Sequence, residues 1–572
     1  MIGRLLLFLN TVRYLRPRQI IYRPIRMLQA RIPSKPGRSA PIDVSRIAQL
    51  GKEVIAWGPG DIDARIARAN EIVRGRFTFL NKSADFSAIP WNEKPISPLW
   101  SFNLHYFDYA VDLAWAFRQT GERKYLERFQ DLFNDWQRST RHGRGDAWAP
   151  YVVSVRVVNL LWTYLLLDAN LDASFGKALM DSVHRQTVYL ERRLEWHLLG
   201  NHLLKNLHAL AVIGLAFEGP DAERWRNEAT SRLQQELQHQ VLADGGHFER
   251  SPMYHALILA DLLELLLARR ACGLTNPADV LATANRMVIA LRLMSRASGE
   301  LRLFNDSANG IAPPTSRLVW LAERLLNAGA VERRCWRLPQ SGYYGIARAN
   351  FDLMIDCGPP GPPYQPGHAH CDILSYELDY NGLPLIIDAG VSDYTPGRFR
   401  EYARSTRAHN TLMIAENEQS EVWGSFRMGR RARVVHAELT DADDKDTASF
   451  AGAYRPYKPR GMVHHRTFFL DSSSFRVIDR VDGNPGFPIT SYVHFHPDCR
   501  IERQNGAFHI VRGTGRLMFE PFGFASAELA CGEENPPQGW YLPEFGVRIA
   551  APVILLRVQR HLNSEFGYTL RV

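Results

Sequence analysis

The spacing of apolar residues changes once along this chain of 572 residues. From Phe102 to about Leu326 apolar side chains recur with the period of an α-helix, in successive segments separated by short turns. Because short connections join antiparallel neighbours, this half predicts helical hairpins, and a toroid of such hairpins fits. We detect no fixed repeat length, which argues against a solenoid of tetratricopeptide or ankyrin type.

After about Leu338 the period becomes that of β-strands, in alternating runs such as FRVIDRVDG and SYVHFHPD bounded by turn residues. Many strands without intervening helices predict an antiparallel β-sandwich. We therefore expect an α+β multidomain chain. It has a basic N-terminal arm and linker over residues 1–60, an (α/α) helical toroid over 61–335 and an antiparallel β-sandwich over 336–572.

The stretch 366–411 gathers an unusual set of polar side chains. Its segment LSYELDYNGLPLIID predicts a β-hairpin, because Asn-Gly supplies the two positive-φ positions of a type I′ turn. The hairpin brings Asp388 back toward His368 and His370, which share one face of an extended backbone, and His409 begins the next apolar run. Two imidazoles and a carboxylate suit zinc, leaving one histidine unassigned. The alternative is a polar strand end with unrelated histidines.

Within the helical half, residues 144–159 carry polar groups that amphipathic packing does not explain. Trp148 and Tyr151 could present a face on which a sugar ring stacks, and Arg156 could pair with a carboxylate. Core packing at a helix start explains the two aromatic residues equally well.

Two helix starts are further candidates. Asn201 and His202 open one helix, where Asn as an N-cap is the structural alternative. Ser251 followed by proline predicts the start of another helix and places Tyr254 and His255 in its first turn. We take His255 as a candidate substrate contact.

The segments GHAHCDILSYEL, LIIDAG and RSTRAHNT together resemble the signature of the heparinase II/III-like polysaccharide lyases, over roughly residues 90–560. The resemblance implies β-elimination in an acidic, uronic acid-containing polysaccharide. The C5 proton of a uronic acid is removed while the O4 group leaves. That reaction needs a neutralised carboxylate, a base for the C5 proton and an acid for O4.

By this resemblance Asn201 and His202 would neutralise the carboxylate, and Tyr254 and His368 would transfer the protons. A free phenol has a pKa near 10 and a free imidazole one near 6.5. His368 is therefore better suited to accept the C5 proton, and Tyr254 to protonate O4. This assignment holds if the C5 proton and the O4 group are anti. If they are syn, Tyr254 could both accept the C5 proton and protonate O4.

The resemblance also implies one zinc ion, held by His370, Asp388 and His409 and structural rather than catalytic. Tyr394 could grip acidic groups of the substrate. The same holds for the arginines of GRFREYARSTR, although a solvated loop explains them equally well: Arg398, Arg400, Arg404 and Arg407.

Composition and charge add less to this interpretation than the motifs do. The net charge of +9 indicates an anionic partner such as an acidic polysaccharide; we find no nucleic-acid-binding motif. Six cysteines without a CxxC pair argue against a disulfide framework.

The apolar run MIGRLLLFLN is too short for a transmembrane helix and no cleavage site follows. We therefore expect a cytoplasmic protein, with the periplasm as the alternative because many related lyases are exported. The basic, aromatic segment that follows is expected to pack on the body, with an anionic membrane surface as the alternative.

Two other functions remain open. A glycoside hydrolase would use a pair of carboxylates, for which Asp244, Glu249 and Asp306 are available, but no two of them sit in a matched setting. A non-catalytic glycan-binding or assembly protein on a lyase scaffold is the third class. The presence of Asn201 and Tyr254 together with the histidines argues against it.

Overall fold

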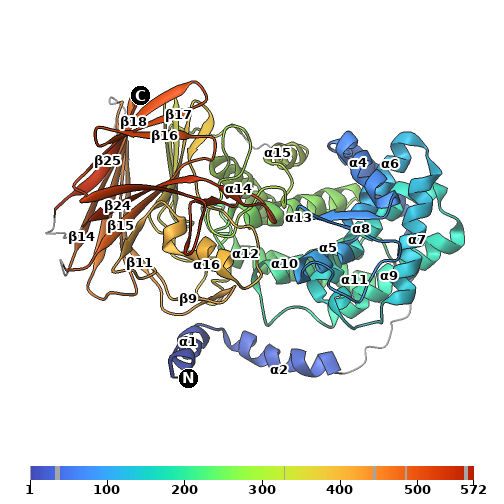
Figure 1. Cartoon of the computed structure of the whole chain (residues 1–572). Coiled ribbons are helices and arrows are strands. Elements are labelled where there is room, and N and C mark those ends of the chain that lie inside the picture. Colours follow the sequence, from blue (N-terminus) through green and yellow to red (C-terminus); the bar gives the residue numbers. More distant parts are fainter. Residues whose placement is uncertain (1, 32–38, 327–328, 442–445, 484–485, 559–563) are drawn as a thin grey trace.

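The two halves of the chain have different architectures (Figure 1). The computed structural model describes all residues except 1, 32–38, 327–328, 442–445, 484–485 and 559–563. Helices dominate up to Glu323 and strands dominate from Cys335 onward. The predicted order, α first and antiparallel β second, is confirmed, and the change falls where the period of the sequence changes.

The helical domain is a toroid in which α6, α8, α10 and α13 pack side by side. Its helices are α3 (Val44–Trp57), α4 (Ile62–Val73), α5 (Pro98–Tyr106), α6 (Asp108–Thr120), α7 (Arg123–Ser139), α8 (Pro150–Leu167), α9 (Ala173–Glu191), α10 (Gly200–Ile213), α11 (Pro220–Arg224), α12 (Thr230–Gln240), α13 (Pro252–Ala271), α14 (Ala278–Met294) and α15 (Thr315–Glu323). A short hairpin, β1 (Arg76–Phe79) with β2 (Lys82–Asp85), interrupts the helices.

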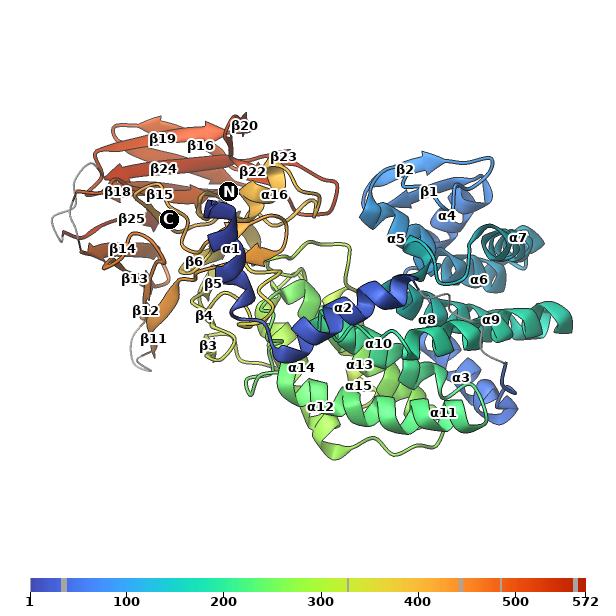
Figure 2. The same ribbon diagram turned by 90° about the horizontal axis from the view of Figure 1, so that it is seen from below.

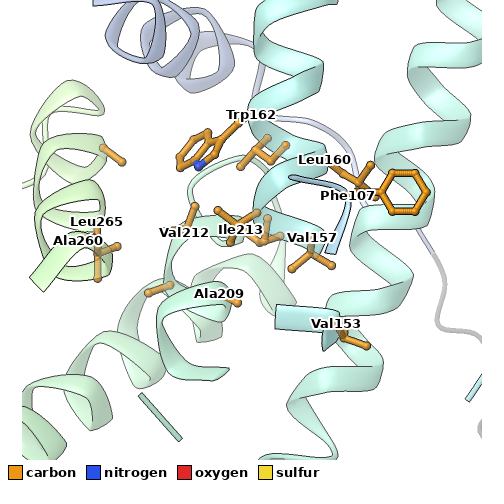
Figure 3. Close-up of a cluster of buried hydrophobic side chains, with 14 of the residues drawn as sticks. Phe107, Val153, Val157, Leu160, Trp162, Ala209, Val212, Ile213, Ala260 and Leu265 are labelled. Carbon is orange, nitrogen blue, oxygen red and sulfur yellow. The ribbon is translucent and has the colours of Figure 1, made fainter. Parts of the chain in front are cut away.

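An apolar core holds these helices together (Figure 3). Val157 of α8 and Ala209 of α10 are fully buried, and Ala260 of α13 is 7% exposed. Small residues such as these alanines let neighbouring helices approach closely. Among the described helices, the stretch Pro150–Asn170, which contains α8, is the one that is long and apolar enough to cross a membrane. However, 78% of its apolar part is buried inside the protein. Helix α8 is the core helix of the toroid.

Helix α3 lies within residues 1–60, where the sequence predicts an arm and a linker. Asp43 caps it by accepting a hydrogen bond from the backbone N of Arg46, and the helix packs against α8 and α13. Its buried face consists of Ile47, Leu50, Val54 and Trp57. The helical period was present in the sequence, but flanking Pro and Gly residues obscured it. The toroid therefore begins before residue 61.

The second domain consists of antiparallel sheets. One has the order β3-β4-β5-β6-β7, a second β11-β12-β13-β14-β25-β18-β17-β16 and a third β19-β24-β15-β8. The strands are β3 (Cys335–Leu338), β4 (Tyr343–Arg348), β5 (Phe351–Asp356), β6 (Ser375–Tyr380), β7 (Leu383–Ile386), β8 (Leu412–Ile414), β11 (Arg433–Asp441), β12 (Ala448–Arg455), β13 (Val463–Leu470), β14 (Ser474–Asp482), β15 (Ile489–His494), β16 (Arg500–Gln504), β17 (Ala507–Arg512), β18 (Gly515–Phe522), β19 (Ser526–Cys531), β24 (Pro552–Val558) and β25 (Phe566–Arg571).

The predicted hairpin is present between β6 and β7. Asn381 and Gly382 both have positive φ, at 52° and 74°, and Tyr380 pairs with Leu383. The turn returns the chain toward the start of β6, and Asp388 follows just after β7.

The N-terminal arm, helices α1 (Ile2–Val12) and α2 (Pro17–Arg31), lies across one outer face of both domains (Figures 1 and 2). Asn10 Nδ2 of α1 donates to Glu421 Oε2 of the β domain at 3.1 Å. Gln19 Nε2 of α2 donates to the carbonyls of Leu198 in the toroid and Tyr364 in the β domain. The arm thus packs on the body, as expected.

Buried ion pairs fasten the segment after α14 to strand β6. Arg296 pairs with both Glu377 and Asp379, and Arg302 contacts Asp379 at 3.2 Å. Glu377 Oε1 also accepts a hydrogen bond from the backbone N of Leu303 at 2.9 Å. These contacts fix the toroid segment that continues into the interdomain junction.

We predict that Glu377→Ala lowers the free energy of unfolding by about 3–5 kcal/mol, because it removes a counter-charge from two buried arginines. Chemical denaturation measures this. Glu528→Ala is the matched control, since the exposed Glu528–Arg557 pair should contribute at most about 1 kcal/mol. Equal losses in the two variants would contradict the prediction.

Candidate active site

Side chains from both domains meet where the starts of α10 and α13 face the segment between β5 and β6. Asn201 Nδ2 lies 3.4 Å from Nε2 of His368. The ring of Tyr254, in the first turn of α13, lies over that of His368 with centroids 4.0 Å apart. The Tyr254 hydroxyl is 3.1 Å from the hydroxyl of Tyr394. The structure thus brings together four of the residues singled out in the sequence.

Glu249 fixes the position of Asn201. Its carboxylate accepts hydrogen bonds from the Asn201 backbone N at 3.1 Å and from Nδ2 at 2.8 Å. Asn201 is the second residue of α10, whose N-cap is Leu199, so the N-cap alternative raised by its sequence position is wrong. The preceding Gly200 has φ +56°, and a Cβ there would lie 2.2 Å from Glu249 Oε1 and 2.5 Å from Gln365. The positive φ favours glycine, and a Cβ would also displace the Glu249 carboxylate that holds Asn201.

Asp306 determines the tautomer of His368. The two are joined by Nδ1 and Oδ2 at 2.9 Å, while Arg400 pairs with both carboxylate oxygens. Burial opposes ionisation of Asp306, but Arg400 and the neighbouring imidazoles hold its pKa well below the usual range. An ionised carboxylate only accepts hydrogen bonds, so Nδ1 of His368 must donate. Its Nε2 is therefore unprotonated, and its lone pair can accept from Nδ2 of Asn201 at 3.4 Å.

Tyr254 is suited to act as an acid. Burial, followed by the contact with Tyr394, raises the pKa of Tyr254 well above 10. The phenol is therefore protonated at neutral pH and can give its proton to a leaving oxygen. Ser251 caps α13 by accepting from the Tyr254 backbone N at 3.2 Å, which confirms the predicted helix start.

His202 adds a second polar group beside Asn201. Its Nδ1 lies 3.3 Å from Glu195 Oε1, and its ring lies 4.8 Å from that of half-buried Tyr151. Burial lowers the pKa of His202, but Glu195 more than offsets this, so the net shift is upward. The imidazole is thereby biased toward the charged form that attracts a carboxylate.

A second group of ligand-type atoms lies behind His368. One atom each from His370, Asp372 and His409 lie within 4.8 Å of one another. Among the described residues, each of these side chains keeps a buried atom without a hydrogen-bond partner: Nδ1 of His370, Oδ2 of Asp372 and Nε2 of His409. The chemistry of this donor set fits a zinc ion.

The other ring nitrogen of each histidine is held by a carboxylate. His370 Nε2 contacts Asp306 Oδ1 at 2.8 Å, and His409 Nδ1 contacts Asp388 Oδ2 at 2.8 Å. Carboxylates commonly orient metal-binding histidines in this way. In this structure Asp388 orients His409, and Asp372 is the carboxylate beside the two free nitrogens.

Family comparison agrees with this arrangement. Residues 62–315 match the model of the heparinase II/III N-terminus, and residues 330–568 match that of the heparinase II/III-like C-terminal domain. This chain belongs to the heparinase II/III family.

Relatives of this heparinase II/III-family chain have more than one name. A heparin-sulfate lyase of Pedobacter heparinus is 25% identical over 443 residues, 71% of this chain and 63% of the relative. FtsZ-localized protein C of Caulobacter vibrioides is 24% identical over 509 residues, 84% of this chain and 83% of the relative. The match thus spans less than two thirds of the lyase's length. A crystal structure of heparinase III aligns with a TM-score of 0.71 at 18% identity, covering 89% of this chain and 84% of that one, and shows the same fold.

Two residues expected to bind substrate lie in the toroid core instead. Arg156 is fully buried, donates to Gln186 Oε1 at 2.7 Å and lies over the Trp136 ring. Trp148 is 6% exposed and packs against Tyr189. Both side chains are structural, and Tyr151 is the member of that segment that lies beside His202.

Two further candidates are also structural. His255 is buried, and its Nε2 lies 2.9 Å from the Met287 carbonyl. Arg404 is 1% exposed and donates to the carbonyls of Ala369 and Gly424, so it positions the segment between His368 and His370. Residue type alone does not distinguish a buried structural arginine from one that binds substrate.

Sequence reasoning missed the supporting roles of Glu249 and Asp306, which it considered only as hydrolase carboxylates. Each is 0–1% exposed and bonded to a candidate catalytic group, Glu249 to Asn201 and Asp306 to His368. The Phe-Asn-Asp-Ser segment that follows α14 is the feature of the sequence that could have indicated Asp306. In the structure, Asn305 of this segment adopts φ 57°.

We expect Asp306→Asn to lower turnover by about 10²-fold or more, because His368 loses the acceptor that sets its tautomer. A buried Arg400 without its counter-charge should also cost about 3–5 kcal/mol of stability. Because Asp306 acts through His368 and does not touch substrate, kcat should fall much more than KM changes.

Asp244→Asn is the matched control, since Asp244 accepts from Ser341 and Gln340 and not from the site histidines. Its kcat and KM should remain those of the wild type. An unchanged kcat in Asp306→Asn would contradict the positioning role.

Proposed function

We propose that this protein is a lyase that cleaves an acidic, uronic acid-containing polysaccharide by β-elimination. The observation that supports this most is the direct contact between a candidate base and a candidate acid. Nε2 of His368 is free to accept a proton, and the stacked Tyr254 phenol holds one.

The proposed reaction has the following steps. Asn201 and His202 bind the uronate carboxylate and stabilise the charge that develops there. His368 Nε2 takes the C5 proton, the C4–O4 bond breaks, and a C4=C5 double bond forms. Tyr254 protonates the departing O4, and Tyr394 is placed to support the phenolate that remains.

The relatives support a polysaccharide substrate with acidic groups, since several are named heparin-sulfate lyases. The half-buried imidazole of His202, biased toward its charged form, suits the same substrate class. We therefore place the carboxylate of the cleaved uronic acid between Asn201 and His202.

The hydrolase alternative is weaker, because Glu249 and Asp306 are committed to Asn201 and His368. A non-catalytic assembly protein remains the second candidate, supported by the similarity to FtsZ-localized protein C over most of both chains. The complete set of hydrogen-bonded proton-transfer groups favours the lyase.

We predict that Tyr254→Phe lowers turnover by roughly 10²-fold or more, because the acid for O4 is lost. The assay follows the ultraviolet absorbance of the unsaturated uronate during digestion of a panel of acidic glycans. Tyr344→Phe, on β4 away from the site, is the control and should keep full activity. Near-normal formation of unsaturated product by Tyr254→Phe would rule out this mechanism. A wild-type protein inactive on every uronic acid-containing glycan would favour the assembly protein.

We also propose one zinc ion, held by His370, Asp372 and His409 with Asp388 orienting His409. Its contribution is structural: it would tie the segment before β6 to the residue that precedes β8. The support is the set of three buried, unpaired ligand atoms.

Elemental analysis should find about one zinc per chain, and chelation should lower the melting temperature. Asp372→Asn should abolish binding, while Asp388→Asn should weaken it by about 10–100-fold. His465→Gln, which replaces a partly exposed histidine on β13, is the control and should leave metal content unchanged. If Asp388→Asn loses the metal and Asp372→Asn keeps it, Asp388 is the ligand.

A further inference from the structure

The N-terminal arm, helices α1 and α2, is amphipathic, and its orientation on the protein is the reverse of the usual one. Its polar side faces the protein: Asn10, Thr11 and Gln19 bond to the body, and Gln29 donates to the Arg192 carbonyl. A surface helix usually buries its apolar side against the protein and leaves its polar side in water. Packing on the body therefore does not explain the apolar side of this arm.

That apolar side is open to solvent. Large apolar residues that are about half or more exposed gather there: Leu5, Leu6, Phe8, Leu9, Ile20, Ile21, Met27 and Leu28. The two helices have 11 and 15 residues, yet they hold eight of the eighteen exposed large apolar side chains in the described part of the chain. Such a concentration marks an interaction surface rather than scattered exposure.

The same segment holds the excess positive charge of the whole protein. Residues 1–42 contain nine Arg and Lys and no Asp or Glu. The other residues therefore contain 60 basic and 60 acidic side chains, so the net charge of +9 belongs to the N-terminal segment alone. Five of its arginines are exposed on or beside the two helices: Arg4, Arg13, Arg16, Arg18 and Arg23.

We propose that this arm docks the protein on an anionic lipid bilayer, with α1 and α2 lying in the plane of the interface. Apolar side chains on one face and arginines along the same segment are the features of an interfacial helix. With 11 residues, α1 is only about 16 Å long, against about 30 Å of hydrocarbon, so it does not span the bilayer.

Charge argues against a second copy of this chain as the partner. A two-fold contact through the arm would bring the same basic segment of each copy together, and like charges at an interface oppose association. An anionic bilayer complements both the apolar side chains and the arginines.

The docked surface lies next to the candidate active site. Gln19 bonds to the carbonyls of Leu198 and Tyr364, which lie shortly before Asn201 and His368 in the chain. In Figure 2 the arm crosses in front of both domains, on one outer face of the molecule. Membrane attachment would therefore hold the candidate active site close to the bilayer surface.

The test is flotation of the full-length protein with vesicles of phosphatidylcholine alone or with about 30% phosphatidylglycerol. We expect the wild type to float with the anionic vesicles and much less with the neutral ones. Phe8→Ser/Leu9→Ser should weaken binding to anionic vesicles at least tenfold. Arg4→Gln/Arg23→Gln should weaken it by roughly fivefold per arginine at low salt.

Matched controls remove the same groups elsewhere. Val435→Ser/Leu529→Ser replaces two apolar residues that are 48% and 46% exposed, and should float like the wild type. Arg500→Gln/Arg516→Gln replaces two exposed arginines of the β domain, and should also float like the wild type. Circular dichroism melts establish that each variant is folded.

Three outcomes would overturn the proposal. One is a wild type that floats with neither kind of vesicle, which would leave the apolar face to a protein partner. Another is a Phe8→Ser/Leu9→Ser variant that floats like the wild type. The third is light scattering in which that variant changes a dimer to a monomer while flotation is unaltered, because the face would then join two copies of this chain.

Discussion

The buried carboxylate of Asp306 is the constraint on which the site depends. It bonds to His368 through one oxygen and to His370 through the other, and Arg400 pairs with both. Taking such a carboxylate out of water is costly unless its partners surround it. The same charge therefore fixes the free nitrogen of the proposed base and the free nitrogen that faces Asp372.

The site belongs to neither domain alone. The toroid supplies Asn201, Tyr254 and Asp306 from two helix starts and one connecting segment, whereas the β domain supplies His368. The ion pairs that Arg296 makes with β6 hold that connecting segment against the sheet. The contacts that stabilise the interface therefore also set the geometry of the site, and a domain isolated from its neighbour lacks one member of the proposed proton-transfer pair.

The location of charge changes its interpretation. A net charge of +9 suggested an acidic substrate, but the excess lies in residues 1–42 and the remaining chain is balanced. In the proposed mechanism, recognition of a uronate rests instead on individual groups, the amide of Asn201 and the imidazole of His202. Net charge describes a whole chain, whereas binding depends on the few side chains that face the ligand.

The sequence by itself determined the features that depend on neighbours along the chain. The change of period gave the two domains, Asn-Gly gave the β6–β7 turn, and Ser251 gave the start of α13. Only the tertiary structure showed that Asp306 faces His368, 62 residues away, and that Arg156 is a core residue. The physical reason is that local propensities follow from adjacent residues, whereas the partner of a buried charge depends on which distant segment packs against it.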